Sequence, residues 1–182
     1  MFVENTQIYY LKNFLNSEEL SIIDQRAASF SVPQTSDTQE KDASQDDRVH
    51  PLYPEDKRDA IFDSLTDRIR DLFKEVYSIP DDYAVHNVHN FHMMYPPFKM
   101  QEHWDGTTPG VHYGAILYIT DPSEYEGGAI YYPHKNISIR PERGSIVMHP
   151  ATEDYLHGVA QVTKGLRVGI SVFVQEEKYM EG

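Results

Sequence analysis

Seven short segments rich in valine, isoleucine, tyrosine and phenylalanine follow one another in the second half of the chain. They cover residues 84–95, 111–120, 128–133, 136–140, 144–149, 156–162 and 166–174. Proline, glycine, aspartate and asparagine separate these segments, which is typical of strands joined by turns. A series of short strands with no helix between them favours two packed antiparallel sheets over a parallel sheet crossed by helices.

Two helices are predicted before the strands. Asn16 has the position of an N-cap, and Glu19, three residues later, completes a capping box;. This helix should end near Phe30. A second amphipathic helix is predicted from about Glu55 to Tyr77, because its apolar residues recur at helical spacing.

The order of these elements predicts an α+β fold that is mainly β. We expect a double-stranded β-helix (jelly roll) with the N-terminal helices packed on one sheet. The helical support would span residues 13–80 and the jelly-roll core residues 83–175, in a single domain of residues 1–182. The polar, acidic stretch 31–53 is either a surface loop or a lid that orders over a substrate.

Charge and composition exclude several classes of protein. The net charge of -13 argues against a nucleic-acid partner, since phosphate binding needs clustered lysine and arginine;. No cysteine is present, so any metal must be bound by histidine and carboxylate side chains;. Without a signal peptide, or an apolar run of the roughly 18 residues that span a bilayer, we expect a cytoplasmic protein without a membrane partner. Nothing in the sequence indicates the oligomeric state.

The segment His103-Trp104-Asp105 contains the strongest candidate metal ligands. In an extended chain, residues two apart point to the same side, so His103 and Asp105 can bind one ion. His157 begins a later strand. Two histidines and one carboxylate can form the facial triad of a non-haem Fe(II) oxygenase.

The other histidines fit a metal site less well. His86 and His92 share a strand face while His89 lies on the opposite face, so this run is not a ready-made set of ligands. His149 lies on the strand before His157. We expect it beside the ligands or in the packing, and not as a ligand itself.

Arg167 occupies one face of the last predicted strand together with Gly169 and Ser171. An arginine between such small residues fits a cavity that receives a carboxylate, because the guanidinium group binds carboxylates with two parallel hydrogen bonds. The alternative is an ordinary surface arginine on a half-exposed strand.

Four segments together resemble the 2-oxoglutarate- and Fe(II)-dependent oxygenases, in particular the prolyl 4-hydroxylase-like branch. The resemblance covers most of residues 91–174, and the order of the segments makes it more specific than any one of them. The chain departs from the family pattern at Phe98, where glycine is usual, and at His149, where phenylalanine is frequent. The matching segments are Tyr95-Pro-Pro with His103-x-Asp105, Leu117-Tyr-Ile-Thr-Asp121 with Glu126-Gly-Gly128 and Pro133, Gly144-Ser-Ile-Val-Met148, and His157-Gly-Val159 with Gly165-Leu-Arg167.

The resemblance implies roles for six residues. His103, Asp105 and His157 would bind Fe(II), and Arg167 and Tyr118 would bind the distal carboxylate of 2-oxoglutarate. Tyr95 would stand nearer the metal end of this co-substrate. For each tyrosine, the alternative is a core aromatic residue whose hydroxyl bonds locally.

The implied activity is that of an oxidoreductase: a dioxygenase that consumes O2 and 2-oxoglutarate, with ascorbate as a candidate reductant. Succinate and CO2 would accompany hydroxylation of a C–H bond, and the resemblance favours a prolyl residue in a peptide or protein. A hydroxylase of a free amino acid or another small molecule is one alternative. A non-catalytic jelly-roll module that binds a metal or ligand is another. A zinc hydrolase would leave Arg167 unexplained.

Overall fold

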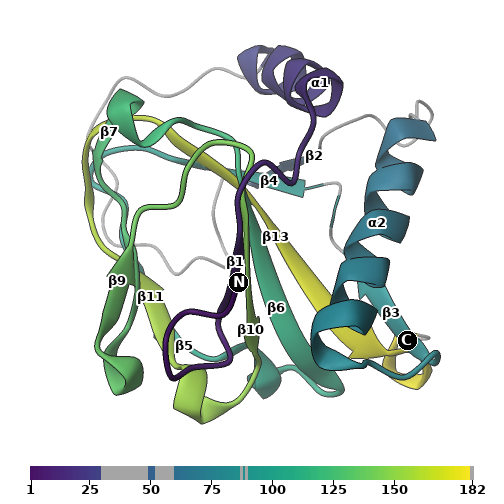
Figure 1. Cartoon of the computed structure of the whole chain (residues 1–182). Helices are drawn as coiled ribbons and strands as arrows, with labels where there is room; N and C mark the ends of the chain where they lie inside the picture. The colour runs from purple at the N-terminus through teal and green to yellow at the C-terminus, as the bar shows by residue number, and fades with distance from the viewer. Residues whose placement is uncertain (30–48, 52–59, 87, 89, 181–182) are drawn as a thin grey trace.

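The computed structural model describes residues 1–29, 49–51, 60–86, 88 and 90–180, and its strands form two facing sheets with a separate strand pair (Figure 1). The larger sheet has seven strands, in the order β1 (Tyr9–Leu11), β10 (Ile146–Pro150), β6 (Val111–Tyr118), β13 (Arg167–Glu176), β4 (Asn90–Met94) and β2 (Val49–Pro51), with β3 (Tyr83–His86) also paired to β13. The smaller sheet has the order β5 (Met100–His103), β11 (His157–Val159), β8 (Ile130–Tyr132) and β9 (Ile137–Ile139), and β12 (Val162–Gly165) pairs with β7 (Tyr125–Gly127).

Two α-helices cover the outer face of the larger sheet, and the smaller sheet lies on its other side (Figure 1). They are α1 (Ser17–Ala28) and α2 (Ala60–Tyr77). Single 3-10 turns occur at η2 (Asp105–Thr107), η3 (Pro122–Glu124), η4 (Pro133–Lys135), η5 (Glu153–Tyr155) and η6 (Glu177–Tyr179). The predicted jelly roll, with its helices on one sheet, is confirmed.

The two faces of the larger sheet face different parts of the structure. Val168, Ile170 and Val172 of β13 point toward the helices and pack with Leu65 and Ile69 of α2 in the main core. The alternate residues face the smaller sheet, as the two-residue period of a strand requires. This inner face carries Arg167 and Gly169 of β13, Gly114 and Tyr118 of β6, and His149 of β10.

The predicted capping box is present at the start of α1. The backbone N–H of Glu19 donates to Asn16 Oδ1 over 2.8 Å, and the backbone N–H of Asn16 donates to Glu19 Oε2 over 2.9 Å. The other oxygen of Glu19 accepts from Arg68 of α2. This one carboxylate therefore joins the start of α1 to α2.

Replacing Asn16 by alanine should lower the free energy of unfolding by about 1 kcal/mol, the usual cost of losing an N-cap. Urea unfolding of the two proteins measures the difference. Ser21→Ala, on the exposed face of the same helix, serves as the control and should leave the stability unchanged. Equal losses in the two variants would contradict the capping role.

Two strand predictions are corrected. Residues 84–95 form two strands, because β13 is long enough for β3 to pair with Phe173–Glu176 and β4 with Arg167–Gly169. Residues 49–51, predicted as loop, form β2, which is hydrogen-bonded to β4.

Other predictions fall on residues that the structure does not describe. They are the start of the second helix at Glu55 and most of the candidate lid, namely residues 31–48 and 52–53 of the stretch 31–53. The first helix is described to its end at Ala28, close to the predicted Phe30. Among the described helices, none is both long and apolar enough to cross a membrane.

Candidate metal centre and co-substrate pocket

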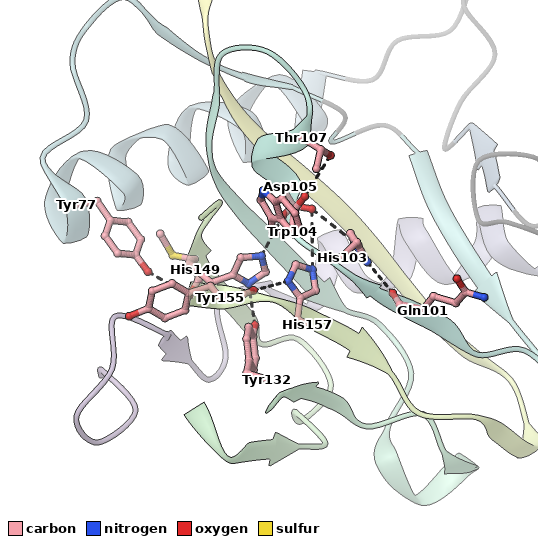
Figure 2. Close-up of polar contacts among 11 residues, drawn as sticks. Tyr77, Gln101, His103, Trp104, Asp105, Thr107, Tyr132, His149, Tyr155 and His157 are labelled. Atoms are coloured by element: carbon pink, nitrogen blue, oxygen red, sulfur yellow. Dashed lines mark hydrogen bonds and ion pairs between the residues drawn. The ribbon is translucent and has the colours of Figure 1, made fainter. Parts of the chain in front are cut away.

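His103, Asp105 and His157 converge at one end of the space between the sheets (Figure 2). Their candidate ligand atoms all lie within 4.8 Å of one another. The two histidines are direct partners across β5 and β11, with ring centroids 4.5 Å apart. Asp105 Oδ1 lies 3.7 Å from Nε2 of His103 and 4.0 Å from Nε2 of His157.

Backbone carbonyl groups determine which ring nitrogen of each histidine faces the centre. Nδ1 of His103 lies 2.9 Å from the carbonyl oxygen of Gln101, and Nδ1 of His157 lies 2.9 Å from that of Tyr155. A carbonyl oxygen only accepts, so each Nδ1 must carry the proton. The lone pair of each Nε2 is therefore available to a metal, the usual arrangement for histidine ligands.

Local backbone geometry brings Asp105 to the histidines. Trp104 has extended dihedral angles (φ -126°, ψ 146°), so His103 and Asp105 lie on the same side, as predicted. The chain then turns into η2, where the N–H of Gly106 donates to the carbonyl oxygen of Ala151 over 2.9 Å. A Cβ at Gly106 would lie 2.2 Å from that oxygen. Glycine therefore permits the close approach that holds the turn in place.

The second carboxylate oxygen of Asp105 is bound by His149. Its Oδ2 lies 3.1 Å from His149 Nε2, and His149 Nδ1 lies 2.8 Å from the hydroxyl of Tyr132. His149 and Tyr132 are both 0% exposed. Burial is the largest influence on the pKa of Asp105 and raises it, but the hydrogen bond from His149 and the three neighbouring histidines outweigh burial and lower the pKa overall.

Arg167, at the start of β13, is buried with only 2% of its surface exposed. Its guanidinium carbon lies 5.2 Å from the ring centre of Tyr118, and its Nη1 donates to Met94 Sδ over 2.8 Å. No carboxylate among the described residues pairs with it. Because an uncompensated buried charge is costly, this arginine fits an anionic ligand.

Two buried tyrosine hydroxyls accompany the arginine. Tyr118 Oη, Tyr125 Oη and Arg167 Nε have no hydrogen-bond partner in the described structure. Burial raises the pKa of Tyr118 to about 12, so its hydroxyl remains a donor at neutral pH. Gly128 (φ +67°) leaves room here, since a Cβ would lie 2.9 Å from Arg167 Cδ and 3.0 Å from the ring of Tyr125. These donors suit a carboxylate.

The model of the 2OG-Fe(II) oxygenase superfamily matches residues 85–175, half of the chain, and this range contains the three candidate ligands and Arg167. The chain belongs to the 2OG-Fe(II) oxygenase superfamily. The family resemblance seen in the sequence is confirmed.

Curated relatives of this oxygenase share a short segment with it. A PKHD-type hydroxylase from Xylella fastidiosa is 38% identical over 64 residues, or 32% of this chain. One from Parvibaculum lavamentivorans is 38% identical over 63 residues, or 34% of this chain. One from Cupriavidus metallidurans is 35% identical over 66 residues, or 34% of this chain. The matches span only 26%, 27% and 27% of these relatives.

Solved structures share the fold of this oxygenase over nearly its whole length. A viral collagen prolyl hydroxylase from Paramecium Bursaria Chlorella virus-1, solved with 2OG, has a TM-score of 0.71 and 13% identity, covering 94% of this chain and 97% of its own. A prolyl hydroxylase from Trichoplax adhaerens, in complex with a peptide fragment of a hypoxia-inducible factor, has a TM-score of 0.69 and 13% identity. The match covers 98% of this chain and 88% of the other.

The residues present fit the metal and the co-substrate after which the superfamily is named. Two histidines and one carboxylate form the ligand set typical of non-haem Fe(II), and the buried donors around Arg167 fit a carboxylate of 2-oxoglutarate. The expected Fe(II), 2-oxoglutarate and O2 are thus confirmed. Ascorbate stays a prediction.

The remaining site predictions have mixed outcomes. His149 lies beside the ligands, as expected. His86 and His92 do share the inner face of the larger sheet, opposite Phe173 and Gly169, and neither belongs to the group of candidate ligands in the described part of the chain.

The role of Tyr95 stays a prediction. This buried residue directly follows β4, in which Met94 contacts Arg167 and Met93 packs under the helices.

Sequence reasoning missed the contributions of Tyr125, Tyr132 and Gly114. Tyr125 directly precedes the Glu126-Gly-Gly128 segment, which was the only available signal. Tyr132 and Gly114 gain their importance from strand pairing, which no local pattern reveals.

His157 should make the metal-free protein less stable in mild acid. Burial lowers the pKa of His157 to about 3, whereas an unfolded histidine titrates near about 6.5. Between these values the unfolded chain binds a proton that the folded chain does not. Stability is therefore greatest above about pH 6.5 and falls by up to about 1.4 kcal/mol per pH unit below it.

Urea unfolding of the metal-free protein at pH 7, 6 and 5 measures this dependence. The His157→Gln variant should show a shallower loss of stability over the same interval. His134→Gln replaces an exposed histidine and should keep the wild-type slope. An unchanged slope in His157→Gln would contradict the burial of a neutral imidazole.

Proposed function

We propose that this protein is an Fe(II)/2-oxoglutarate-dependent dioxygenase that hydroxylates a prolyl residue in a peptide or protein. The observation that carries the proposal is the triad, from β5, η2 and β11, combined with the buried donors around Arg167 on the inner face of the larger sheet. Either feature alone would be compatible with a simple metal-binding or anion-binding protein. Together they match the two reagents of one reaction class.

The three side chains of the triad differ in exposure. The side chain of His103 is 40% exposed, whereas those of Asp105 and His157 are 9% and 6% exposed. We infer that the substrate approaches past His103, and that the buried ligands shield the opposite side from water.

The residues of the chain serve to bind and orient. His103, Asp105 and His157 would hold the metal. Arg167 offers its guanidinium fork to the distal carboxylate of 2-oxoglutarate, and Tyr118 and Tyr125 each offer a hydroxyl. When bound, Fe(II), 2-oxoglutarate and O2 supply the oxidising chemistry that yields succinate, CO2 and a hydroxylated C–H bond.

A peptide or protein substrate is supported by the folds that this chain shares. Among the similar structures are several prolyl hydroxylases, one of them bound to a peptide. The net charge of -13 favours a basic substrate through long-range attraction;. The first alternative is a hydroxylase of a free amino acid or other small molecule. The second is a non-catalytic module that binds a metal or ligand.

Purified protein with Fe(II), 2-oxoglutarate and O2 should be offered panels of proline-rich and lysine-rich peptides. We expect succinate to form and a prolyl peptide to gain the mass of one oxygen atom. The His103→Ala variant provides the inactive control. Succinate without any oxidised prolyl peptide would rule out the prolyl substrate, and no succinate from any mixture would rule out the dioxygenase.

A further inference from the structure

A chain of hydrogen bonds leads from the core to the candidate carboxylate ligand. It joins Tyr132 on β8, His149 on β10 and Asp105 at the start of η2 (Figure 2). We propose that His149, held in place by Tyr132, is a positioning residue that orients Asp105 toward the metal. The inference rests on the proposed function only in that Asp105 binds a metal.

The direction of these hydrogen bonds follows from the chemistry of the three groups. An ionised carboxylate only accepts, so Nε2 of His149 must carry the proton that it donates to Asp105. In the tautomer with its single proton on Nε2, Nδ1 accepts, and the hydroxyl of Tyr132 is the donor that faces it over 2.8 Å;. Tyr132 thereby selects the one tautomer of His149 that can bind Asp105.

The two oxygens of Asp105 are assigned to different partners by this arrangement. Oδ1 faces the Nε2 atoms of His103 and His157, while Oδ2 is 3.1 Å from His149. A carboxylate bonded in this way offers one oxygen to the metal.

Gly114 provides an independent observation in favour of this role. It lies on β6 directly opposite His149. A Cβ at this position would lie 2.2 Å from Asp105 Oδ2 and 2.8 Å from His149 Nε2. The neighbouring strand thus lacks a side chain where one would displace the hydrogen bond.

Burial makes the network difficult to explain as packing alone. His149 and Tyr132 are both 0% exposed, and polar groups in a closed core are destabilising unless each finds a partner. A phenylalanine at this position would fill the space without a polar atom. A buried histidine at this position therefore indicates that its hydrogen bonds to Tyr132 and Asp105 have a function.

Titration of the purified protein with Mn(II), without 2-oxoglutarate, tests the inference through metal affinity alone. His149→Phe and Gly114→Ala should each weaken binding about 10- to 100-fold, the usual effect of losing a group that orients a ligand. His149→Gln should recover most of the affinity, because its amide can donate to Asp105. Tyr132→Phe should weaken binding by a smaller factor.

Met148→Leu is the matched control, because Met148 is the buried neighbour of His149 on the opposite face of β10. It should bind Mn(II) as the wild type does. Wild-type affinity in His149→Phe, or equal losses in His149→Phe and His149→Gln, would overturn the positioning role. If His149→Phe does not fold, Tyr132→Phe decides: weaker Mn(II) binding than in the wild type supports the positioning role, and unchanged binding overturns it. A wild-type protein that binds no metal would instead overturn the triad itself.

Discussion

Replacing His103 by alanine is expected to abolish the conversion of 2-oxoglutarate to succinate and to weaken Fe(II) binding by more than about 100-fold. The change removes one of the three proposed ligands, so the loss of affinity should exceed the 10- to 100-fold effect of losing a group outside the ligand set. His103 is 40% exposed at the end of β5, so the free energy of unfolding should change by no more than about 0.5 kcal/mol. Metal titration, succinate formation and urea unfolding measure the three quantities.

His134→Ala is the control for this variant, since His134 is an exposed histidine outside the site. It should retain wild-type turnover. Unchanged turnover in His103→Ala would show that the metal is bound elsewhere. A loss of turnover accompanied by unfolding would show that His103 is needed for the fold, which contradicts a role limited to metal binding.

Replacing Arg167 by methionine should weaken 2-oxoglutarate binding by at least about 30-fold, because truncating one partner of a buried charge pair costs roughly 2 kcal/mol or more. Metal affinity should be unchanged. The metal-free variant should be no less stable than the wild type, since it no longer buries a guanidinium group without a carboxylate partner. Lysine at this position keeps the charge but not the fork, so Arg167→Lys should bind with intermediate affinity.

Calorimetric titration of 2-oxoglutarate into the Mn(II)-loaded proteins measures these affinities, and thermal unfolding measures the stability. Arg70→Met, a change at a half-buried arginine on α2 outside the pocket, is the control and should bind 2-oxoglutarate normally. Two results would contradict the pocket: normal binding by Arg167→Met, or a large loss of stability without ligand, which would indicate a structural role for the arginine.

The parts of the site that the sequence predicted depend on local geometry. The H-x-D segment needs only one extended residue, Trp104, to place His103 and Asp105 on the same side. Alternation along β13 likewise predicted that Arg167 shares a face with Gly169. The capping box of Asn16 and Glu19 is local as well. Each of these features is determined by residues a few positions apart.

The parts that the sequence did not predict depend on pairing between distant strands. Tyr132, His149 and Gly114 lie on three strands of two sheets. His149 meets Asp105 on one side and Tyr132 on the other, opposite Gly114, because of how these strands are arranged. β3 and β4 were predicted as one strand because both are apolar, whereas each pairs with a different part of β13. Side-chain patterns show which face a residue takes, but not which strand lies beside it.

The most direct test is an anaerobic titration of the metal-free protein with Fe(II) and then 2-oxoglutarate, followed by visible absorption. We expect one equivalent of each to produce the charge-transfer band of an Fe(II)-bound 2-keto acid. The same band should be lost in His103→Ala and should require far more 2-oxoglutarate in Arg167→Met. A wild-type protein that binds Fe(II) but gives no band at any concentration of 2-oxoglutarate would contradict the assignment of the site.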